Sequence, residues 1–314
     1  MSEIILALIA GYVLDLLLGD PEWLYHPVCL IGQYVSWMEK RLRARGGNLR
    51  YSAVLLTVST VLITMSAVFL LLGALRMVGS VPYFIGMVLL DWMGLATTSL
   101  AKAARGVEKA LERGLAHGRR QVARIVGRDT DSLSESEVIK ATIETVAENT
   151  ADGVISPMLY AAIGGPVLLW GFKAVSTLDS MVGYLDEKYR DIGWSSARLD
   201  DVLNYIPARL TALLLCLSAG LTGLNIRMAL HIVWRDHANH KSPNCAWSEA
   251  AVAGALQVQL GGTHSYFGKM VEKPTIGDNE RPVTCADIRK TVWLMYLAGL
   301  LMMVALTAAG LIFK

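Results

Sequence analysis

The chain has 314 residues, of which 54% are hydrophobic and only 18% are charged. Its mean hydropathy of +0.43 excludes an ordinary soluble domain and predicts an integral membrane protein. The formal net charge of +2 favours no nucleic-acid partner, and the four widely spaced cysteines predict neither a disulfide framework nor a CxxC pair.

Six segments are apolar enough to be considered as membrane spans, because a helix needs about 20 apolar residues to cross about 30 Å of hydrocarbon. In chain order they cover residues 4–19, 51–75, 77–101, 153–172, 206–226 and 291–313. Gly164-Gly165-Pro166 interrupts the fourth segment and allows two half-helices, as in a re-entrant element. We therefore predict an all-α polytopic membrane protein with about five to six hydrophobic segments, forming one membrane-embedded domain over residues 1–314.

Basic residues gather in two stretches and predict the orientation of the chain in the membrane. Residues 40–50 hold five basic residues and no acid, and residues 102–128 hold eight basic residues against two acids. The two spans between them turn at residues 79–82, which places both stretches on one side, the cytoplasmic side by the positive-inside rule. We expect helical cytoplasmic segments at 101–152, with Ser134 or Ser136 as a helix N-cap, and a polar cytoplasmic loop at 227–290.

Carboxylates crowd the sequence just before the fourth hydrophobic segment. Glu144 and Glu148 are one helical turn apart and share a face, and Asp152 follows where Gly153 lets the helix stop or bend. Carboxylates that converge at a membrane boundary repel one another unless a cation neutralises them. Oxygen ligands suit Mg²⁺ carrying a nucleotide phosphate, so these residues are metal-ligand candidates. The alternative is a solvated acidic helix end.

Ionisable residues also flank the apolar segments further along the chain. Lys173, Asp179 and Ser180 lie at the end of the fourth segment, where intramembrane charges are functional candidates. Snorkelling of Lys173 to the interface is the alternative. Arg209, at the start of the fifth segment, is a candidate anion-binding residue.

The densest polar block covers residues 235–249. It contains candidate phosphate ligands and groups suited to a reacting carboxylate, namely Arg235, Asp236, Lys241, Ser242 and Asn244. A simple polar loop is the alternative, and zinc binding by the H-x-x-H pair lacks a clear third ligand. The glycine-rich stretch 261–270 has the wrong spacing for a Walker A loop, and Met270 stands where the Mg²⁺-binding hydroxyl is required.

Five strings in fixed order carry a resemblance over nearly the whole chain. They are the LGDP and HPV strings of residues 18–28, ETVAENTADGVISP at 144–157, KAVSTLDSMVGY at 173–184, ARLDD with NYIPAR at 197–209, and residues 235–262. In these the chain resembles the CobD/CbiB family of adenosylcobinamide-phosphate synthases.

The resemblance implies a carbon-nitrogen ligase of cobalamin biosynthesis in the cell membrane, with its active site on the cytoplasmic side. It would join the ring D propionate of adenosylcobyric acid, a corrinoid, to aminopropanol phosphate or ethanolamine phosphate and consume Mg-ATP. On this hypothesis Glu144, Glu148 and Asp152 bind Mg²⁺, and Asp179 or Asp236 accepts the ammonium proton. Ser242 and Asn244 orient the carboxylate. The expected phosphate and substrate ligands are Lys173, Ser180, Arg209, Arg235 and Lys241.

Two other functions fit parts of the same pattern. A membrane transporter of an anionic metabolite also places charges beside broken helices, but it predicts internal symmetry that the sequence lacks. A membrane scaffold that associates with other corrinoid-pathway enzymes fits the basic helix predicted at 101–125. Turnover by the purified protein separates an enzyme from both.

Overall fold

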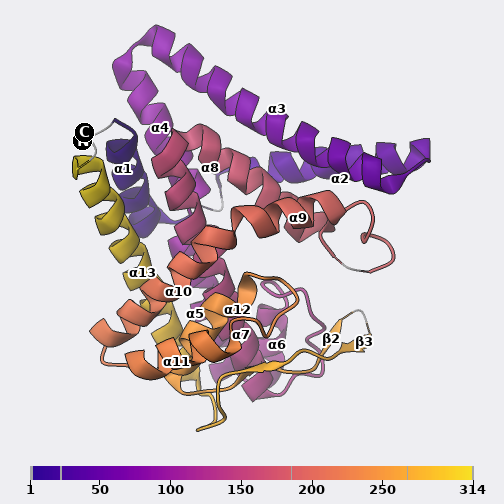
Figure 1. Cartoon of the computed structure of the whole chain (residues 1–314), viewed down its shortest axis with the longest axis vertical. Helices are drawn as coiled ribbons and strands as arrows, with labels where there is room; N and C mark the ends of the chain where they lie inside the picture. The colour runs from indigo at the N-terminus through magenta and orange to yellow at the C-terminus, as the bar shows by residue number, and fades with distance from the viewer. Residues whose placement is uncertain (1–2, 22, 185, 267, 313–314) are drawn as a thin grey trace. The chain divides into compact units, whose positions relative to one another are not determined.

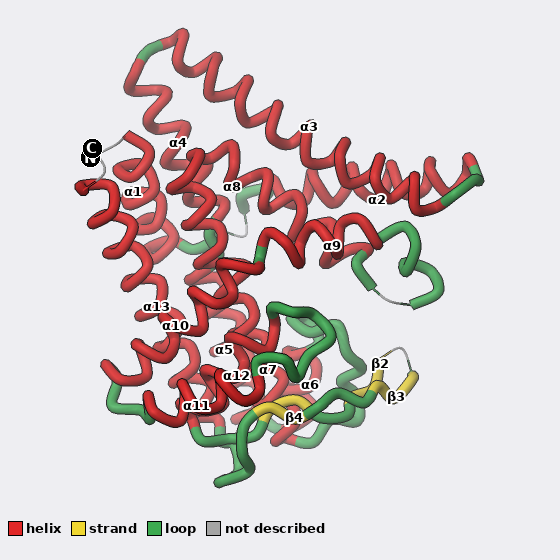
Figure 2. The backbone as a smooth tube through the Cα atoms, in the orientation of Figure 1, coloured by secondary structure: helices red, strands yellow, loops and turns green. Residues whose placement is uncertain are grey.

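The computed structural model describes residues 3–21, 23–184, 186–266 and 268–312. Helices make up 76% of the chain, and the strands of the described part are short and confined to one region (Figure 2). The prediction of an all-α polytopic membrane protein is confirmed. The chain divides into two compact units that interleave along the sequence, so each unit is described by itself. A single domain over 1–314 remains a prediction.

The first unit comprises residues 1–96, 156–204 and 303–314. Its helices are α1 (Glu3–Leu18), α2 (Pro27–Arg45), α3 (Leu49–Val78), α4 (Ser80–Gly94), α8 (Ser156–Val182) and α9 (Trp194–Leu203), with the end of α13 (Cys285–Ile312). Helices α3, α4 and α8 pack on one another, and α1 packs against α4 and α8 (Figure 1).

Four helical stretches are long and apolar enough to cross a membrane within the described residues. They are Leu49–Val78, Ser80–Glu112, Glu135–Val182 and Cys285–Ile312. A fifth is obtained if α9 and α10 (Tyr205–Leu221), which bend by 48° at their junction, form one broken span. The predicted segment at residues 4–19 is helical, but α1 has only 16 residues. A helix of that length is short for the hydrocarbon core.

The expected break in the fourth segment is present. Gly164 and Gly165 have non-helical backbone angles inside α8, and Gly165 has a φ of 64°, a conformation that glycine adopts without steric cost. Pro166 follows, and because proline has no backbone N–H it cannot donate a hydrogen bond to the preceding turn. The helix is therefore two segments joined at these glycines, as the sequence indicates.

The second unit comprises residues 97–155 and 205–302. Its helices are α5 (Thr97–Glu112), α6 (Leu115–Val122), α7 (Glu135–Thr150), the π-helical turn η1 (Ala151–Ile155), α10, α11 (Ile226–Asp236), α12 (Cys245–Leu256) and most of α13. Helix α12 is buried on nearly every side and contacts α7, α10 and α11. Its small side chains make this possible: at Gly254 an added Cβ would lie 2.5 Å from the Met228 carbonyl oxygen. The basic helix expected at 101–125 is in fact α5 and α6, broken at Gly114, whose φ is 116°.

Helix α7 begins and ends in ways that bear on the candidate metal residues. Ser134 is its N-cap, in a capping box with Glu137, which confirms the first of the two expected caps. At the other end the helix does not stop at Gly153 but widens into η1. π-helical turns are rare and are found mostly at functional sites. Asp152 lies in this turn.

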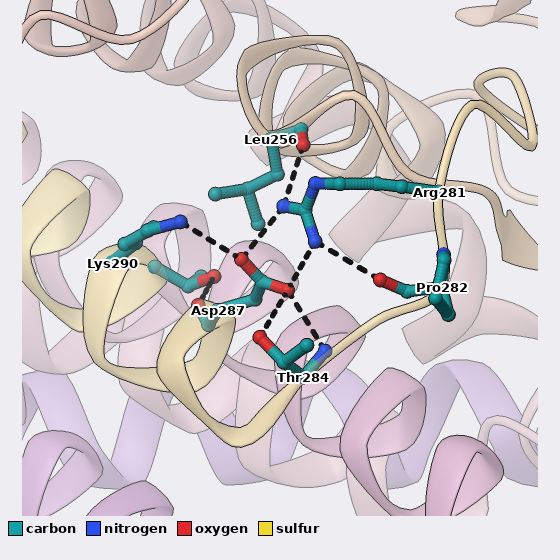
Figure 3. Close-up of polar contacts among 7 residues, drawn as sticks. Leu256, Arg281, Pro282, Thr284, Asp287 and Lys290 are labelled. Atoms are coloured by element: carbon teal, nitrogen blue, oxygen red, sulfur yellow. Dashed lines mark hydrogen bonds and ion pairs between the residues drawn. The ribbon is translucent and has the colours of Figure 1, made fainter.

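An ion cluster around one buried carboxylate fastens the start of α13 to the end of α12 (Figure 3). The fully buried Asp287 carboxylate accepts bonds from both terminal nitrogens of Arg281, each at 2.8 Å, and from Lys290 Nζ at 3.3 Å. Arg281 also donates to the Leu256 carbonyl, and Thr284 donates its N–H and its hydroxyl to Asp287. The buried charge is therefore compensated on every side, as its burial requires.

Two short antiparallel strand pairs lie between α12 and α13. Strand β1 (Leu260–Gly261) pairs with β4 (Thr275–Ile276), and β2 (His264–Tyr266) pairs with β3 (Lys269–Val271). The glycine-rich stretch that fails the Walker A test thus enters strands and turns and precedes no helix. This agrees with the sequence analysis.

Candidate functional site

Helices α7 and α12 bring acidic residues together in the second unit. The Cys245 thiol donates to Glu148, with 3.1 Å between Sγ and Oε1. Burial raises the pKa of this thiol well above its usual value, and the charges of Glu148, Glu249 and Asp152 add to the effect. Cys245 is therefore a protonated donor and not a thiolate nucleophile.

Glu144, one turn before Glu148, is 6% exposed and is held from two sides. Its Oε2 is paired with Arg128, and its Oε1 accepts the Gly261 N–H at 2.8 Å. The Arg128 side chain is 7% exposed. Its Nη1 is buried and has no hydrogen-bond partner among the described residues. Buried donors are nearly always satisfied, so this nitrogen is a candidate to bind a ligand oxygen.

Glu249 is a functional candidate to which the sequence analysis assigned no role. It lies on α12 one turn after Cys245 and is 7% exposed. Among the residues that the structure describes, none donates a hydrogen bond to its carboxyl group. Burial raises the pKa of Glu249 well above its usual value, and the negative charges of Glu144 and Glu148 raise it further. The sequence does carry a signal for this residue, because an acidic side chain next to a run of small apolar residues is a functional candidate.

Two basic side chains also face these acids. Burial lowers the pKa of His240, and the charge of Lys273 lowers it further, while Glu148 and Glu144 oppose the shift. The ring is therefore neutral at neutral pH, with Nδ1 accepting the Ser242 N–H at 3.0 Å. His240 Nε2 and Lys273 Nζ are 3.5 Å apart. Lys273, in the loop between β3 and β4, also escaped the sequence analysis because its neighbours form no motif.

Arg235 and Asp236 are engaged with each other and with the residues after β4, so their role in the structure is to hold these segments together. Arg235 donates to both oxygens of Asp236, at 2.7 and 2.8 Å, and to Asp278 at 2.8 Å. Asp236 also accepts the Gly277 N–H at 2.7 Å. The hydrogen bonds from Arg235 lower the pKa of Asp236 below its usual value, and the Gly277 N–H adds to this effect. These contacts hold the end of α11 against the residues after β4, and a carboxylate so engaged is a weak base.

The loop from 237 to 244 carries three more of the predicted residues. Lys241 is exposed. The Asn244 N–H donates to Ser242 Oγ at 3.3 Å, and Asn244 Oδ1 accepts from Arg209 Nη1 at 3.4 Å. Arg209 also stacks on two rings, 3.4 Å from the Tyr205 centroid and 4.6 Å from that of Trp247. The guanidinium is thereby held at the loop beside Asn244.

Three predicted site residues belong to the first unit instead. Lys173, Asp179 and Ser180 lie on α8. The Ser180 hydroxyl donates to the Thr177 carbonyl oxygen at 2.9 Å. A Cβ added to Gly183 would lie only 2.0 Å from Asp179 Oδ1, so the Asp179 carboxylate packs closely against this glycine.

Lys173 has neighbours from the N-terminal block. Burial lowers the pKa of His26, an effect that Lys173 reinforces and Asp20 opposes. His26 Nε2 lies 3.9 Å from Asp20 Oδ1, and the His26 ring is 6.3 Å from that of Trp170. Packing thus joins two strings that are far apart in the sequence.

The acids fit a magnesium-nucleotide complex better than a metal cage made by the protein alone. No group of three or more His, Cys, Asp or Glu side chains is arranged to hold a metal ion within the described ranges. Mg²⁺ bound with a nucleotide takes most of its ligands from water and phosphate and needs only one or two carboxylates. Both Glu144 oxygens are engaged, by Arg128 and by the Gly261 N–H, so Glu144 is less available as a metal ligand than the sequence analysis expects.

Comparison of the sequence with known proteins identifies the family of this chain. The family described as CobD/Cbib protein matches residues 8–295. The chain belongs to the CobD/CbiB family. It is 50% identical over 300 residues to the cobalamin biosynthesis protein CobD of Geobacter metallireducens, a match that covers 94% of this chain and 93% of that protein.

Further CobD/CbiB relatives are similar over the same length. The CobD protein of Listeria monocytogenes is 46% identical over 299 residues, covering 94% of this chain and 95% of that protein. The cobalamin biosynthesis protein CbiB of Salmonella typhi is 46% identical over 319 residues, covering 97% of each. No solved structure matches the chain. Membership in the CobD/CbiB family gives this protein a role as a biosynthetic enzyme in cobalamin biosynthesis.

Proposed function

We propose that this protein is an adenosylcobinamide-phosphate synthase. It forms an amide between the propionate carboxylate of adenosylcobyric acid and the amine of aminopropanol phosphate or ethanolamine phosphate, with consumption of ATP. The observation that carries the proposal is the gathering of acids and bases in the second unit, around Glu148, Arg128 and Lys273, in a chain of the CobD/CbiB family.

The reaction needs an activated carboxylate, because a carboxylate does not condense with an amine at neutral pH. Transfer of the terminal phosphoryl group of ATP to the carboxylate oxygen releases ADP and gives an acyl phosphate. The amine then attacks the acyl carbon, phosphate leaves, and the attacking nitrogen loses a proton. When bound, Mg²⁺ neutralises the phosphate charge of ATP in the first step.

The second unit supplies groups for each of these charges. Arg128, whose Nη1 has no hydrogen-bond partner in the described part of the chain, and Lys273 join Arg209 and Lys241 as phosphate-binding candidates. Glu148 and Asp152 are the proposed carboxylates for Mg²⁺. Asn244 and Ser242 remain the groups that orient the reacting carboxylate. Arg235 now has a positioning role, because it fastens the loop that carries them.

A proton acceptor near the amine must have a carboxyl group that is not already engaged. Asp236 is held by Arg235 and the Gly277 N–H. Glu249 has no hydrogen-bond partner among the described residues and lies beside Glu148 and Glu144. We therefore add Glu249 to Asp179 and Asp236 as a candidate base and favour it over Asp236.

The protein is a multi-pass membrane protein, and we place it in the cell membrane with the site on the cytoplasmic side. The positive-inside rule supports this, because α2 carries basic residues before the hairpin of spans from Leu49 to Glu112, and the end of α5 together with α6 carries basic residues at the other end of that hairpin. Nucleotide and phosphorylated substrates are cytoplasmic, which requires the same orientation.

The deciding experiment is turnover by the detergent-purified protein. It is incubated with adenosylcobyric acid, aminopropanol phosphate and Mg-ATP, and the products are identified by mass spectrometry. We expect an amide product whose mass equals the two substrates minus water, together with ADP and phosphate. No amide product from folded protein, with either amino alcohol phosphate, refutes the proposal and favours a transporter or scaffold.

A further inference from the structure

A groove on the first unit has a composition that the proposed chemistry does not use. It has a volume of about 680 Å³ and is lined by Cys29, Gly32, Gln33, Ser36, Trp37, Lys40, Arg41 and Ala44 of α2 and by Met181 of α8. Lys40 and Arg41 are its only charged residues among those described, so the groove carries positive charge and no negative charge. The volume is that of a ligand site.

The lining residues form one stripe along α2. Cys29, Gln33, Trp37 and Arg41 follow one another at intervals of four residues, the spacing of one helix face. From Cys29 to Arg41 the stripe is about 18 Å long at 1.5 Å per residue. The charges lie at its C-terminal end only. The groove is therefore apolar or neutral along most of its length and cationic at one end.

Aromatic side chains reinforce the cationic end. The Arg41 guanidinium lies 4.6 Å from the centre of the Trp37 ring, which is 49% exposed. The Tyr34 ring is 5.8 Å from that of Trp37. Trp, Tyr and basic residues together are typical of the level of lipid headgroups, where the rings meet the acyl chains and the cations meet phosphate.

The connection to α3 orients the groove relative to the hydrocarbon. Only residues 46–48 separate α2 from α3, and the two helices pack against each other as a hairpin (Figure 1). The cationic end thus lies beside the start of the candidate membrane span Leu49–Val78. One leaflet of hydrocarbon is about 15 Å thick, close to the length of the stripe.

We propose that this groove binds one anionic glycerophospholipid, with the headgroup phosphate at Lys40 and Arg41 and an acyl chain along the stripe from Trp37 to Cys29. The occupant is a lipid rather than a soluble phosphate because only a lipid matches both the cationic end and the apolar length. The site is independent of the proposed ligase reaction and requires only that the protein lies in a membrane.

Native mass spectrometry of the full chain tests the site. The protein is exchanged into detergent with equal amounts of phosphatidylglycerol and phosphatidylcholine that have the same acyl chains. We expect wild-type protein to retain one phosphatidylglycerol in preference to phosphatidylcholine. The double variant K40Q/R41Q should bind it about 25-fold more weakly, since each basic residue near a membrane surface contributes about fivefold.

Two further variants make the result specific to the groove. R45Q/R120Q removes the same charge from exposed positions that do not line the groove, and it should retain the lipid. Ala44→Trp keeps both cations but fills the exposed cationic end with a large ring, and it should weaken retention. Thermal unfolding of each variant verifies that it is folded.

Three outcomes overturn the proposal. They are a wild-type protein without selectivity for phosphatidylglycerol over phosphatidylcholine, an equal loss of phosphatidylglycerol in both double variants, and retention of phosphatidylglycerol by folded K40Q/R41Q. The second outcome identifies a diffuse charge effect and not a site.

Discussion

Cys245 donates its thiol hydrogen to Glu148, although 97 positions separate the two residues. This bond sets the first turn of α12 against the last turn of α7. Glu249 lies one turn after Cys245 on α12, and Glu144 lies one turn before Glu148 on α7. The negative charges of Glu144 and Glu148 both raise the pKa of Glu249.

Glu148→Gln should separate the carboxylate's charge from its role in packing. Glutamine keeps an oxygen that accepts the Cys245 thiol, so the melting temperature should change little. Loss of the charge should lower Mg-ATP-dependent activity at least about tenfold, equal to about 1.4 kcal/mol of transition-state stabilisation. Glu135→Gln, at an exposed position of the same helix, is the control. Equal activity in wild type and Glu148→Gln would remove Glu148 from the metal proposal.

Glu249→Gln should abolish most activity without unfolding the protein. The pKa of Glu249 lies above its usual value of 4.5 in the folded state. Stability is therefore fully present below pH 4.5 and decreases as pH rises from 4.5 through the folded pKa. Because glutamine cannot ionise, the variant should lose less stability over that interval. Melting temperatures from pH 5 to 9 measure the difference, and a parallel pH dependence in the two proteins would contradict it.

Asp236→Asn should lower stability in a pH-dependent way. The folded pKa of Asp236 lies below its usual value of 3.8, so the stability it contributes is present above pH 3.8 and is lost as pH falls through the folded pKa. We expect a cost of about 1–3 kcal/mol at pH 7. The cost should shrink below pH 3.8. Denaturant unfolding at pH 7, 5 and 3.5 measures it, with the exposed Asp131→Asn as a control that should show no such trend.

Gly254→Ala should destabilise the second unit, since its Cβ would lie 2.5 Å from the Met228 carbonyl oxygen and 2.7 Å from Ala229 Cα. Overpacking against backbone costs about 1–3 kcal/mol. Gly73→Ala in α3 is the matched control because a Cβ there meets nothing within 4 Å, and alanine favours the helix by up to about 1 kcal/mol. Thermal unfolding should rank Gly73→Ala at or above wild type and Gly254→Ala below it.

Reporter insertions should test the orientation of the hairpin of spans. Alkaline phosphatase, which is active only outside the cytoplasm, should be inactive after Gly47 and Gly114 and active after Gly79. These positions flank the spans Leu49–Val78 and Ser80–Glu112. Activity at Gly47 with none at Gly79 would reverse the proposed orientation.

Much of the fold could be predicted because its signals are local. Hydrophobic length marks the spans, the Gly164-Gly165 pair marks the break in α8, and Ser134 with Glu137 marks the start of α7. The π-helical turn at Asp152 was expected only as a stop or bend. The choice between ending and widening a helix depends on the packing around it.

The candidate site could be predicted only in part. Glu144 and Glu148 share a face by their spacing alone, and the structure places them on the α12 side of α7. The weaker case for Asp236 as proton acceptor and the positioning role of Arg235 depend on Gly277 and Asp278, some 40 residues away. No pattern around residues 235–249 shows that these partners exist.

The amino-acid sequence by itself determined that the chain lies in a membrane, that it is helical, and to which family its strings point. These are properties of segments, set by apolar length, glycine and proline positions and short runs of side chains. Only the tertiary structure decided that Arg128, Lys273 and Glu249 share surroundings with Glu144 and Glu148. The physical reason is that burial and charge act through space, so the neighbours that set them come from distant helices and loops.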